Sequence, residues 1–239
     1  MDAEVIDGVS ILRLNRPPVN ALDLDLVEDA VTTLRSVEGP VVITGTGRCF
    51  SAGVDLRAVV DGGREYTQRF LDAMPTAFLA VFDHPGPVVA AINGHAIAGG
   101  CVVAMAADVR LMSGGTIGLT EVAVGVPFPA AALEICRYAM GTSASNAMLG
   151  AQTVDATTAL QRGWVDAVVP ADELLSEAIA TARALGAHSP FAYAATKDQL
   201  HRPTRTAIDA AAAIDPRVRE GWMSDETFAR ISDYLAGLK

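Results

Sequence analysis

A pair of adjacent glycines, Gly99 and Gly100, separates a strand-like segment from an apolar helix-like segment in the stretch INGHAIAGGCVVAM. The first amides of a helix have no partner within the helix and carry partial positive charge. Because small residues let a ligand approach the backbone closely, an amide here could meet a negatively charged oxygen. The glycines could also serve only to let the helix pack closely against a strand.

A second stretch of the chain has the same plan. PVVITGTGRCFSAG and PVVAAINGHAIAGG share a Pro-Val-Val strand, a glycine turn and a pair of small residues. Twelve residues after Pro40 and Pro87 stand Ala52 and Gly99. If these are neighbouring strand-turn units, the two amides converge and form an oxyanion hole, which stabilises an enolate-like oxygen. Because such short motifs are common, the matching spacing could also be chance.

The first turn of the helix expected after the glycines carries Val102 and no acid, so it cannot move a proton. Glu121, further along the chain, is a carboxylate with apolar neighbours. The apolar neighbours Leu119, Val122 and Val124 indicate burial, which would raise the pKa of the Glu121 carboxyl toward a value useful for a general base. A carboxylate after Thr120 is also typical of an ordinary helix start, where a negative charge favours the helix dipole.

Strands that alternate with helices must position these residues, so the sequence predicts an α/β protein. The first sixteen residues alternate in polarity and break at Asp7-Gly8, which predicts a hairpin. Apolar runs predict buried strands at 40–45 and 87–92, with short strands at 108–113, 116–119 and 164–170. Helices are expected at 23–37 with Asp23 as cap, at 64–82, after Gly99, at 171–187, and three times in the last fifty residues.

Composition excludes several classes of protein. The net charge of −10 argues against binding to nucleic acid or to anionic membranes. Three separated cysteines and four scattered histidines show no metal-ligand spacing, so we expect no metal site and a reducing, cytoplasmic location. The uncharged segment 85–107 is broken by prolines and glycines, which favours a buried strand and helix over a membrane span.

Several motifs together resemble the crotonase family of enoyl-CoA hydratases and isomerases. They are LNRPPVNAL (14–22), FSAGVDL (50–56), INGHAIAGGC (92–101), IGLTEVAVGVPF (117–128) and ALQRGWVDAVVP (159–170). The resemblance covers residues 3–200 and implies a superhelix of repeated ββα units with a helical C-terminal region. We therefore expect a core at 1–187 and a helical region at 188–239 for trimerisation and coverage of coenzyme A.

The resemblance also implies an acyl-CoA thioester as the substrate, homotrimers or hexamers, and no cofactor beyond the coenzyme A of the substrate. By motif position, the oxyanion amides belong to Ala52 and Gly99, and Glu121 is the catalytic base. The substrate-binding residues implied in the same way are Cys49, Phe50, Asp55, Leu56, Gly100 and Lys197. Arg48, Arg57 and Arg64 flank the first loop and could meet phosphates.

Hydratases of the family use two glutamates, and the first of these positions is Val102 here. One base suffices for a 1,3-proton shuttle, so the pattern favours a Δ3,Δ2-enoyl-CoA isomerase, whose IGL-x-E and Pro-Phe segments this chain resembles. Two alternatives remain open. A hydratase or another crotonase activity would need an unrecognised acid such as Glu134, and an acyl-CoA-binding protein would have lost catalysis.

Overall fold

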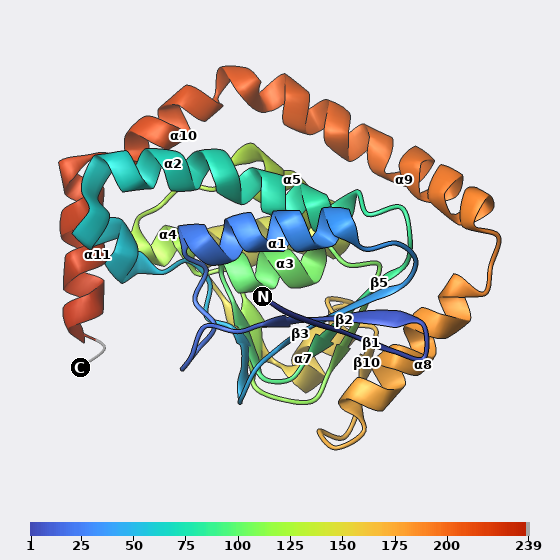
Figure 1. The fold of residues 1–239 in the computed structure, drawn as a ribbon. Coiled ribbons are helices and arrows are strands. Elements are labelled where there is room, and N and C mark those ends of the chain that lie inside the picture. The colour runs from blue at the N-terminus through green and yellow to red at the C-terminus, as the bar shows by residue number, and fades with distance from the viewer. Residues whose placement is uncertain (238–239) are drawn as a thin grey trace.

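The computed structural model describes residues 1–237 and contains two β-sheets surrounded by helices (Figure 1). The larger sheet has the order β1-β2-β3-β5-β7-β10, and the smaller one has the order β4-β6-β8-β9. Only the β1–β2 and β8–β9 pairs are antiparallel. The strands are β1 (Asp2–Ile6), β2 (Val9–Leu14), β3 (Val41–Gly45), β4 (Cys49–Ser51), β5 (Val88–Ile92), β6 (His95–Ile97), β7 (Val109–Met112), β8 (Thr116–Gly118), β9 (Thr153–Asp155) and β10 (Ala167–Val168).

Three consecutive ββα units build the centre of the molecule. Each unit gives one strand to the larger sheet, the next strand to the smaller sheet, and then a helix. The units are β3-β4-α2 with α2 at Leu56–Phe82, β5-β6-α3 with α3 at Gly99–Met105, and β7-β8-α4 with α4 at Glu121–Val124. This arrangement confirms the predicted repeated ββα fold, and it places the starts of all three helices after strands of the smaller sheet.

The remaining helices form two layers and a C-terminal arm (Figure 1). They are α1 (Leu24–Ser36), α5 (Ala130–Met140), α6 (Ala144–Leu149), α7 (Ala156–Gln161), α8 (Leu174–Gly186), α9 (Pro190–Ala210), α10 (Asp215–Trp222) and α11 (Asp225–Gly237), with 3-10 turns at Gly141–Ser143 and Ala211–Ala213. The main apolar core lies between the larger sheet and helices α1, α2, α3 and α5. A smaller core joins the opposite face of the sheet to α8.

Most expected elements are present, and two differ in extent. The helix expected from Arg64 begins at Leu56, but Gly63 has a non-helical backbone (φ 61°, ψ −156°), so the continuous helix does start beside Arg64. The strand expected at 164–170 is reduced to Ala167–Val168, because Trp164 turns inward and is fully buried. The Asp23 carboxylate caps α1 by accepting from the Leu26 amide at 2.9 Å, as predicted.

The C-terminal helices run across the top of the molecule and down its left side in Figure 1, where α11 reaches the beginning of α2. Arg64 ties the two together, because its side chain donates to the Met223 carbonyl (3.0 Å) and to Asp225 (2.6 Å). After α9, helices α10 and α11 thus bring the C-terminal part of the chain back to the start of α2. Independence of residues 188–239 as a domain stays a prediction.

Candidate active site

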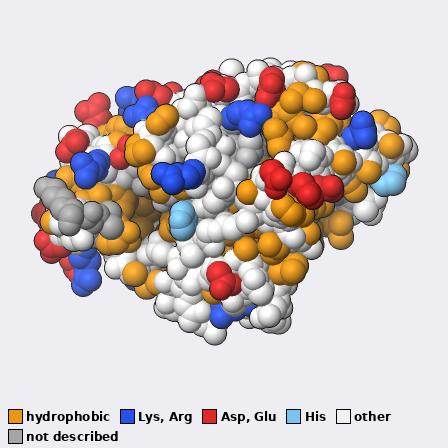
Figure 2. Space-filling view, turned by 90° about the horizontal axis from the view of Figure 1, so that it is seen from below, with side chains coloured by type: hydrophobic (Ala, Val, Ile, Leu, Met, Phe, Trp, Pro, Cys, Tyr) orange, Lys and Arg blue, Asp and Glu red, His pale blue; other side chains and the backbone are white. Residues whose placement is uncertain are grey.

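A cavity of about 740 Å³ lies where the starts of α2 and α4 meet α10 and α11. Its lining combines two cations, Arg16 and Arg57, with many apolar side chains. In Figure 2 a hollow with an apolar floor is visible on the side of the molecule where the chain ends. The lining residues are Arg16, Pro17, Pro18, Val19, Ala21, Ala52, Val54, Asp55, Leu56, Arg57, Ile97, Ala98, Thr120, Glu121, Val124, Val126, Trp222, Tyr234 and Leu235.

A small recess of about 10 Å³ adjoins this cavity, since Val54, Glu121 and Trp222 line both spaces. The other residues that line the recess are Met74, Phe78, Gly99, Val102, Phe128, Pro129 and Ala132. Glu121 is therefore the only ionisable side chain in the recess, within the described part of the chain. Val102 is fully buried there and supplies a methyl surface where an acid would stand in a two-carboxylate site.

Glu121 is the first residue of α4, and its side chain is 8 % exposed. Burial raises the pKa of this carboxyl from 4.5 to about 7, because the ionised form loses its hydration. Its Oε2 atom is buried and has no hydrogen-bond partner among the described residues. A buried carboxyl with a free oxygen and a pKa near neutrality can accept a proton from a substrate at neutral pH.

Two unpaired backbone amides lie beside Glu121. The Gly99 amide begins α3, and the Val54 amide belongs to the loop before α2; neither has an acceptor within residues 1–237. Val54 pairs with Leu22 in a parallel bridge, in which Leu22 bonds to Gly53 and Asp55, so the Val54 amide points away from Leu22. These are the donors available to an oxygen that becomes negatively charged.

The structure corrects the predicted oxyanion role of the Ala52 amide. That amide donates to the Val19 carbonyl at 2.9 Å, so it is already paired, although Ala52 does line the cavity. Two register shifts explain the error. Val41 pairs with Val88, 47 positions on, but Cys49 pairs with His95, 46 positions on, so the first turn is one residue longer than the second. Within the next pair of strands Ser51 pairs with Ala96, 45 positions on, so β4 contains one more extra residue.

Three residues after Ser51 and Ala96 stand Val54 and Gly99. The twelve-residue repeat assumed a uniform register and therefore pointed to the wrong neighbour of Gly99. Close packing supports the corrected pairing, because a Cβ atom on Gly53 would lie 2.9 Å from the Ala98 side chain and 3.1 Å from the Gly99 nitrogen. The φ of 50° at Ala98 helps to set the direction of the Gly99 amide.

Asn20 is a positioning residue that the sequence analysis missed. It is fully buried, with a left-handed backbone (φ 52°), and its Nδ2 donates to the carbonyls of Thr46, Cys49 and Phe50. Its own carbonyl accepts from the Ser51 hydroxyl at 2.7 Å. Asn20 thus holds the chain just before the Ala52–Val54 loop. The signal was an asparagine in the PPVN turn, since asparagine tolerates positive φ and bonds to nearby backbone.

The predicted substrate-binding residues divide into two groups. Asp55 and Leu56 line the cavity, and the Asp55 carboxylate also caps α2 by accepting from the amides of Arg57 (3.1 Å) and Ala58 (3.0 Å). Cys49 and Phe50 do not line it: their side chains are buried and their carbonyls accept from Asn20. The bulged strand turns both side chains into the core, and the predicted contact of their backbone with a substrate stays a prediction.

Gly100 serves packing rather than contact with the cavity. A Cβ atom at this position would lie 2.4 Å from the Ser51 carbonyl oxygen, so only glycine allows α3 to approach β4 so closely. Its neighbour Gly99 also has little room, with Leu22 Cδ1 at 3.1 Å from a Cβ built there. The glycine pair therefore combines the two explanations considered for it: Gly99 leaves an amide free, and Gly100 permits close packing.

Lys197 does not line this cavity, where it was expected to meet the phosphates of coenzyme A. The residue is 7 % exposed, and its Nζ donates to Asp108 at 2.8 Å and to the Gly86 carbonyl at 3.3 Å. It lines a different cavity, beneath α9. That prediction is wrong for the described chain, because α9 directs this lysine inward to a buried carboxylate.

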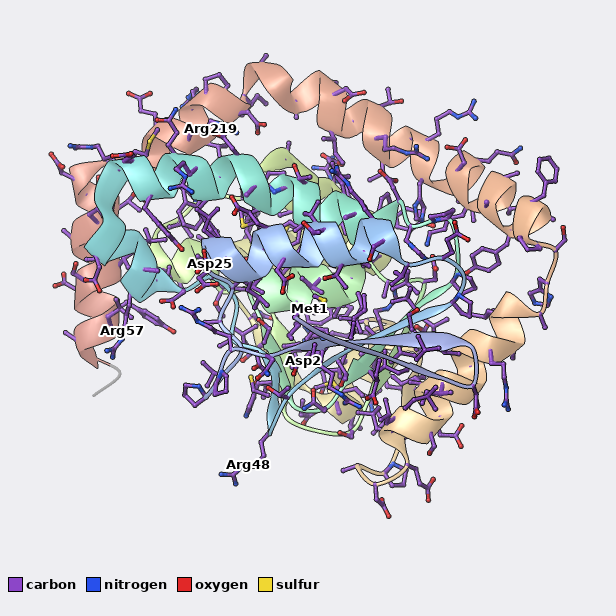
Figure 3. The ribbon with its side chains drawn as sticks, in the orientation of Figure 1. Met1, Asp2, Asp25, Arg48, Arg57 and Arg219 are labelled. Atoms are coloured by element: carbon purple, nitrogen blue, oxygen red, sulfur yellow. The ribbon has the colours of Figure 1, made fainter. Side chains whose placement is uncertain are left out.

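The three arginines near the first loop lie in different parts of the molecule. Figure 3 shows Arg57 at the beginning of α2, next to α11, whereas Arg48 projects from the bottom of the molecule, well away from it. Arg64 is engaged with Asp225. Arg57 and Arg16 are therefore the cations at the cavity.

Glu134, the candidate second acid, does not line either space around Glu121. Its buried carboxylate pairs with Arg137 at 2.9 Å on the same helix. Within residues 1–237 no cluster of potential metal ligands is present. No helix of that part is both long and apolar enough to cross a membrane.

The family model and the relatives that match this chain point to the same family. The family model described as enoyl-CoA hydratase/isomerase matches residues 4–232. A 2,3-dehydroadipyl-CoA hydratase of Escherichia coli (strain K12) is 32 % identical over 214 residues, which cover 86 % of this chain and 83 % of that protein. A probable enoyl-CoA hydratase of Mycobacterium tuberculosis (strain CDC 1551 / Oshkosh) is 30 % identical, covering 88 % of this chain and 84 % of that one.

A solved structure adds a second activity to the comparison. The crystal structure of human mitochondrial delta3-delta2-enoyl-CoA isomerase superposes with a TM-score of 0.91 at 26 % identity, and the match covers 99 % of this chain and 96 % of that chain. Overall similarity therefore connects the chain with hydratases and isomerases alike, so the site must decide between the two activities.

Proposed function

The chain belongs to the enoyl-CoA hydratase/isomerase family, and on this premise we propose that it is a Δ3,Δ2-enoyl-CoA isomerase with Glu121 as its single base. One observation carries the proposal. Glu121 has a free buried oxygen and a pKa of about 7, and the fully buried Val102 lines the same recess in place of a second acid. One base can move a proton between two carbons, whereas the family's water addition uses two.

The reaction starts at C2 of a 3-enoyl thioester. Ionised Glu121 removes a C2 proton, and the electron pair of that C–H bond delocalises through the former 3,4 double bond and the thioester carbonyl. The resulting dienolate carries its charge on the thioester oxygen and on C4. Protonated Glu121 then returns the proton to C4, the double bond settles between C2 and C3, and the carboxylate is regenerated. No atom is gained or lost.

The amides of Val54 and Gly99 stabilise the dienolate oxygen. Both are unpaired within the described residues, and preorganised donors of this kind typically supply about 3 kcal/mol each to the transition state. The Val54 amide leads directly to the Asp55-capped α2, and the Gly99 amide begins α3, so partial positive charge from both helix starts adds to the donors.

The polarity of the cavity fits an acyl-CoA. Arg57 in the lining suits the phosphates of coenzyme A, and so does Arg16, which also pairs with Asp23. The apolar lining residues Val124, Val126 and Trp222 suit an acyl chain. Pro17 and Pro18, next to Arg16 in the sequence, add a rigid apolar surface to the wall. A homotrimer or hexamer remains part of the proposal.

Hydration is the alternative that the named relatives favour. Asp55 is the second carboxylate that lines the cavity within the described residues, but it already caps α2 through two amides. To activate water, it would have to leave those donors. A protein that only binds acyl-CoA is the remaining alternative.

An ultraviolet assay of the conjugated enoyl thioester separates the three functions. We expect conjugation to appear from a 3-enoyl-CoA and to be lost in Glu121→Gln, while Glu134→Gln, which alters a buried carboxyl outside the cavity, leaves the rate within about twofold. Conjugation lost from a 2-enoyl-CoA would mean hydration. Tight binding without either change would leave a binding protein and refute the isomerase proposal.

A further inference from the structure

A second cavity, of about 710 Å³, lies beneath α9 on the side of the molecule away from Glu121. It shares no lining residue with the cavity and recess around Glu121. Its walls come from α2, α5, α9, the segments on either side of β7's start, and the turn before α9. The lining residues are Phe82, Ala107, Asp108, Arg110, Tyr138, Ala139, His188, Tyr193, Thr196, Lys197, Leu200 and His201.

Unsatisfied polar atoms concentrate at this cavity. Within the described residues, four buried side-chain nitrogen or oxygen atoms have no hydrogen-bond partner, namely Arg110 Nε, Glu121 Oε2, His201 Nδ1 and Arg205 Nε. Glu121 belongs to the active site, whereas Arg110 and His201 both line the cavity beneath α9. A buried polar atom without a partner is costly, so such atoms indicate a missing binding partner.

The cavity also has a flat aromatic wall. The rings of Phe82 and His201 stack with centroids 3.6 Å apart and planes 9° apart. Tyr138 stands edge-on to both rings, with centroids 5.5 Å and 5.1 Å away. Phe82 and His201 are 1 % and 4 % exposed, so their rings are held in place, whereas Tyr138 is 43 % exposed and supplies most of the free area of this wall. A flat apolar group could pack along it.

The cations of the lining retain N–H donors for an anion. Lys197 pairs with Asp108 at 2.8 Å, and Arg110 pairs with Asp166 at 3.1 Å, so an anion would be held by their unused donors rather than by an excess of charge. The Lys197 ammonium has three donors and two acceptors, Asp108 and the Gly86 carbonyl. Arg110 uses its terminal nitrogens on Ala107 and Asp166, which leaves Nε unpaired.

From the free donors, the orphaned imidazole and the aromatic wall, we propose that the cavity beneath α9 is a second binding site, for a small monocarboxylate with a flat apolar body. The carboxylate would accept from Arg110 and Lys197, and the body would lie against Phe82, His201 and Tyr138. The site is separate from the proposed isomerase site and does not depend on it.

His201 provides a reporter of occupancy. Burial is the largest cause that lowers its pKa, to about 4, and the charges of Lys197 and Arg205 lower it further. Asp108 opposes them, as does the nearby Phe82 carbonyl. A bound carboxylate would add negative charge close to the ring and favour the imidazolium. The pKa of His201 should therefore rise when the cavity is filled.

The test uses benzoate as probe and benzamide as its neutral counterpart, with the full-length protein. We expect calorimetry to show saturable benzoate binding at least about tenfold tighter than benzamide binding. Titration of His201 by NMR should show its pKa rising by about one pH unit with benzoate and staying unchanged with benzamide.

Two exposed positions on α9 give a matched pair of variants. Thr196 lines the cavity, so Thr196→Asp places a negative charge at its edge and should weaken benzoate binding about tenfold. Gln199 is exposed and does not line the cavity, so Gln199→Glu adds the same charge and should change binding less than about twofold. No binding, equal binding of benzamide, or an equal effect of the two variants would overturn the proposal.

Discussion

Replacing Glu121 with glutamine should stabilise the protein, and increasingly so as the pH rises. The carboxyl is buried and its pKa is raised from 4.5 to about 7, so the folded protein holds its proton more tightly than the unfolded chain does. Stability from this group is complete below about pH 4.5 and is lost as the pH rises through 7. Glutamine is neutral throughout and avoids this loss.

The size of the effect follows from the shift. One pKa unit corresponds to about 1.4 kcal/mol, so the shift from 4.5 to about 7 corresponds to about 3 kcal/mol once the carboxyl is ionised. At about pH 5 the unfolded chain has only begun to ionise this group, and the difference is below about 1 kcal/mol. The advantage of Glu121→Gln should therefore grow by about 2.5 kcal/mol between pH 5 and pH 8.

Urea unfolding of both proteins at one protein concentration, from about pH 5 to pH 9, measures this growth. The change with pH matters rather than the value at one pH, because any constant difference in packing between the two side chains cancels. Asp155→Asn is a control without a pH trend: the amide of Thr158 lowers the pKa of that exposed helix cap, so the carboxylate is ionised in the folded and the unfolded chain across this range, and its difference from wild type should stay constant. A difference between wild type and Glu121→Gln that stays constant with pH would refute a buried, proton-holding Glu121.

The remaining predictions concern the proposed isomerase and its support. Isomerisation should follow the ionisation of Glu121, so log kcat/KM should rise with a slope of one up to about pH 7 and then level; a flat profile would contradict this role. Val54→Pro removes one amide donor and should lower kcat about 100- to 1,000-fold with little change in the affinity for a saturated acyl-CoA, whereas an effect on affinity alone would exclude the Val54 amide from the oxyanion hole. Asn20→Ala leaves three carbonyls without their donor and should reduce the free energy of unfolding by about 3 kcal/mol, measured in urea, and a change below about 1 kcal/mol would show that water replaces the amide.

The periodic parts of the fold could be predicted because their determinants are local. The buried strands at 40–45 and 87–92, the Asp23 cap and the amphipathic helix α8 each follow from residues a few positions apart. Their repetition indicated strand-turn units, and the motif resemblance implied the ββα fold. The helix expected from Arg64 missed the first turns of α2, which begins at Leu56, and no break at Gly63 was predicted.

The errors at the site arose where tertiary geometry overrides spacing. The offset between paired residues is 47 at Val41–Val88, 46 at Cys49–His95 and 45 at Ser51–Ala96, so the register shifts by two positions and the free amide is displaced from Ala52 to Val54. Lys197 was assigned from a motif match, but the direction of α9 carries it to Asp108. Asn20 was passed over because its role depends on carbonyls more than 25 residues away in sequence.

Mass spectrometry of the product tests the central claim most directly. Wild-type protein and Glu121→Gln are incubated separately with a 3-enoyl-CoA and with the corresponding 2-enoyl-CoA at about pH 8. The proposed single-base mechanism predicts that wild type converts the 3-enoyl thioester into the 2-enoyl isomer of unchanged mass, that Glu121→Gln does not, and that the 2-enoyl thioester gains no water. A product heavier by one water molecule at a comparable rate would contradict it.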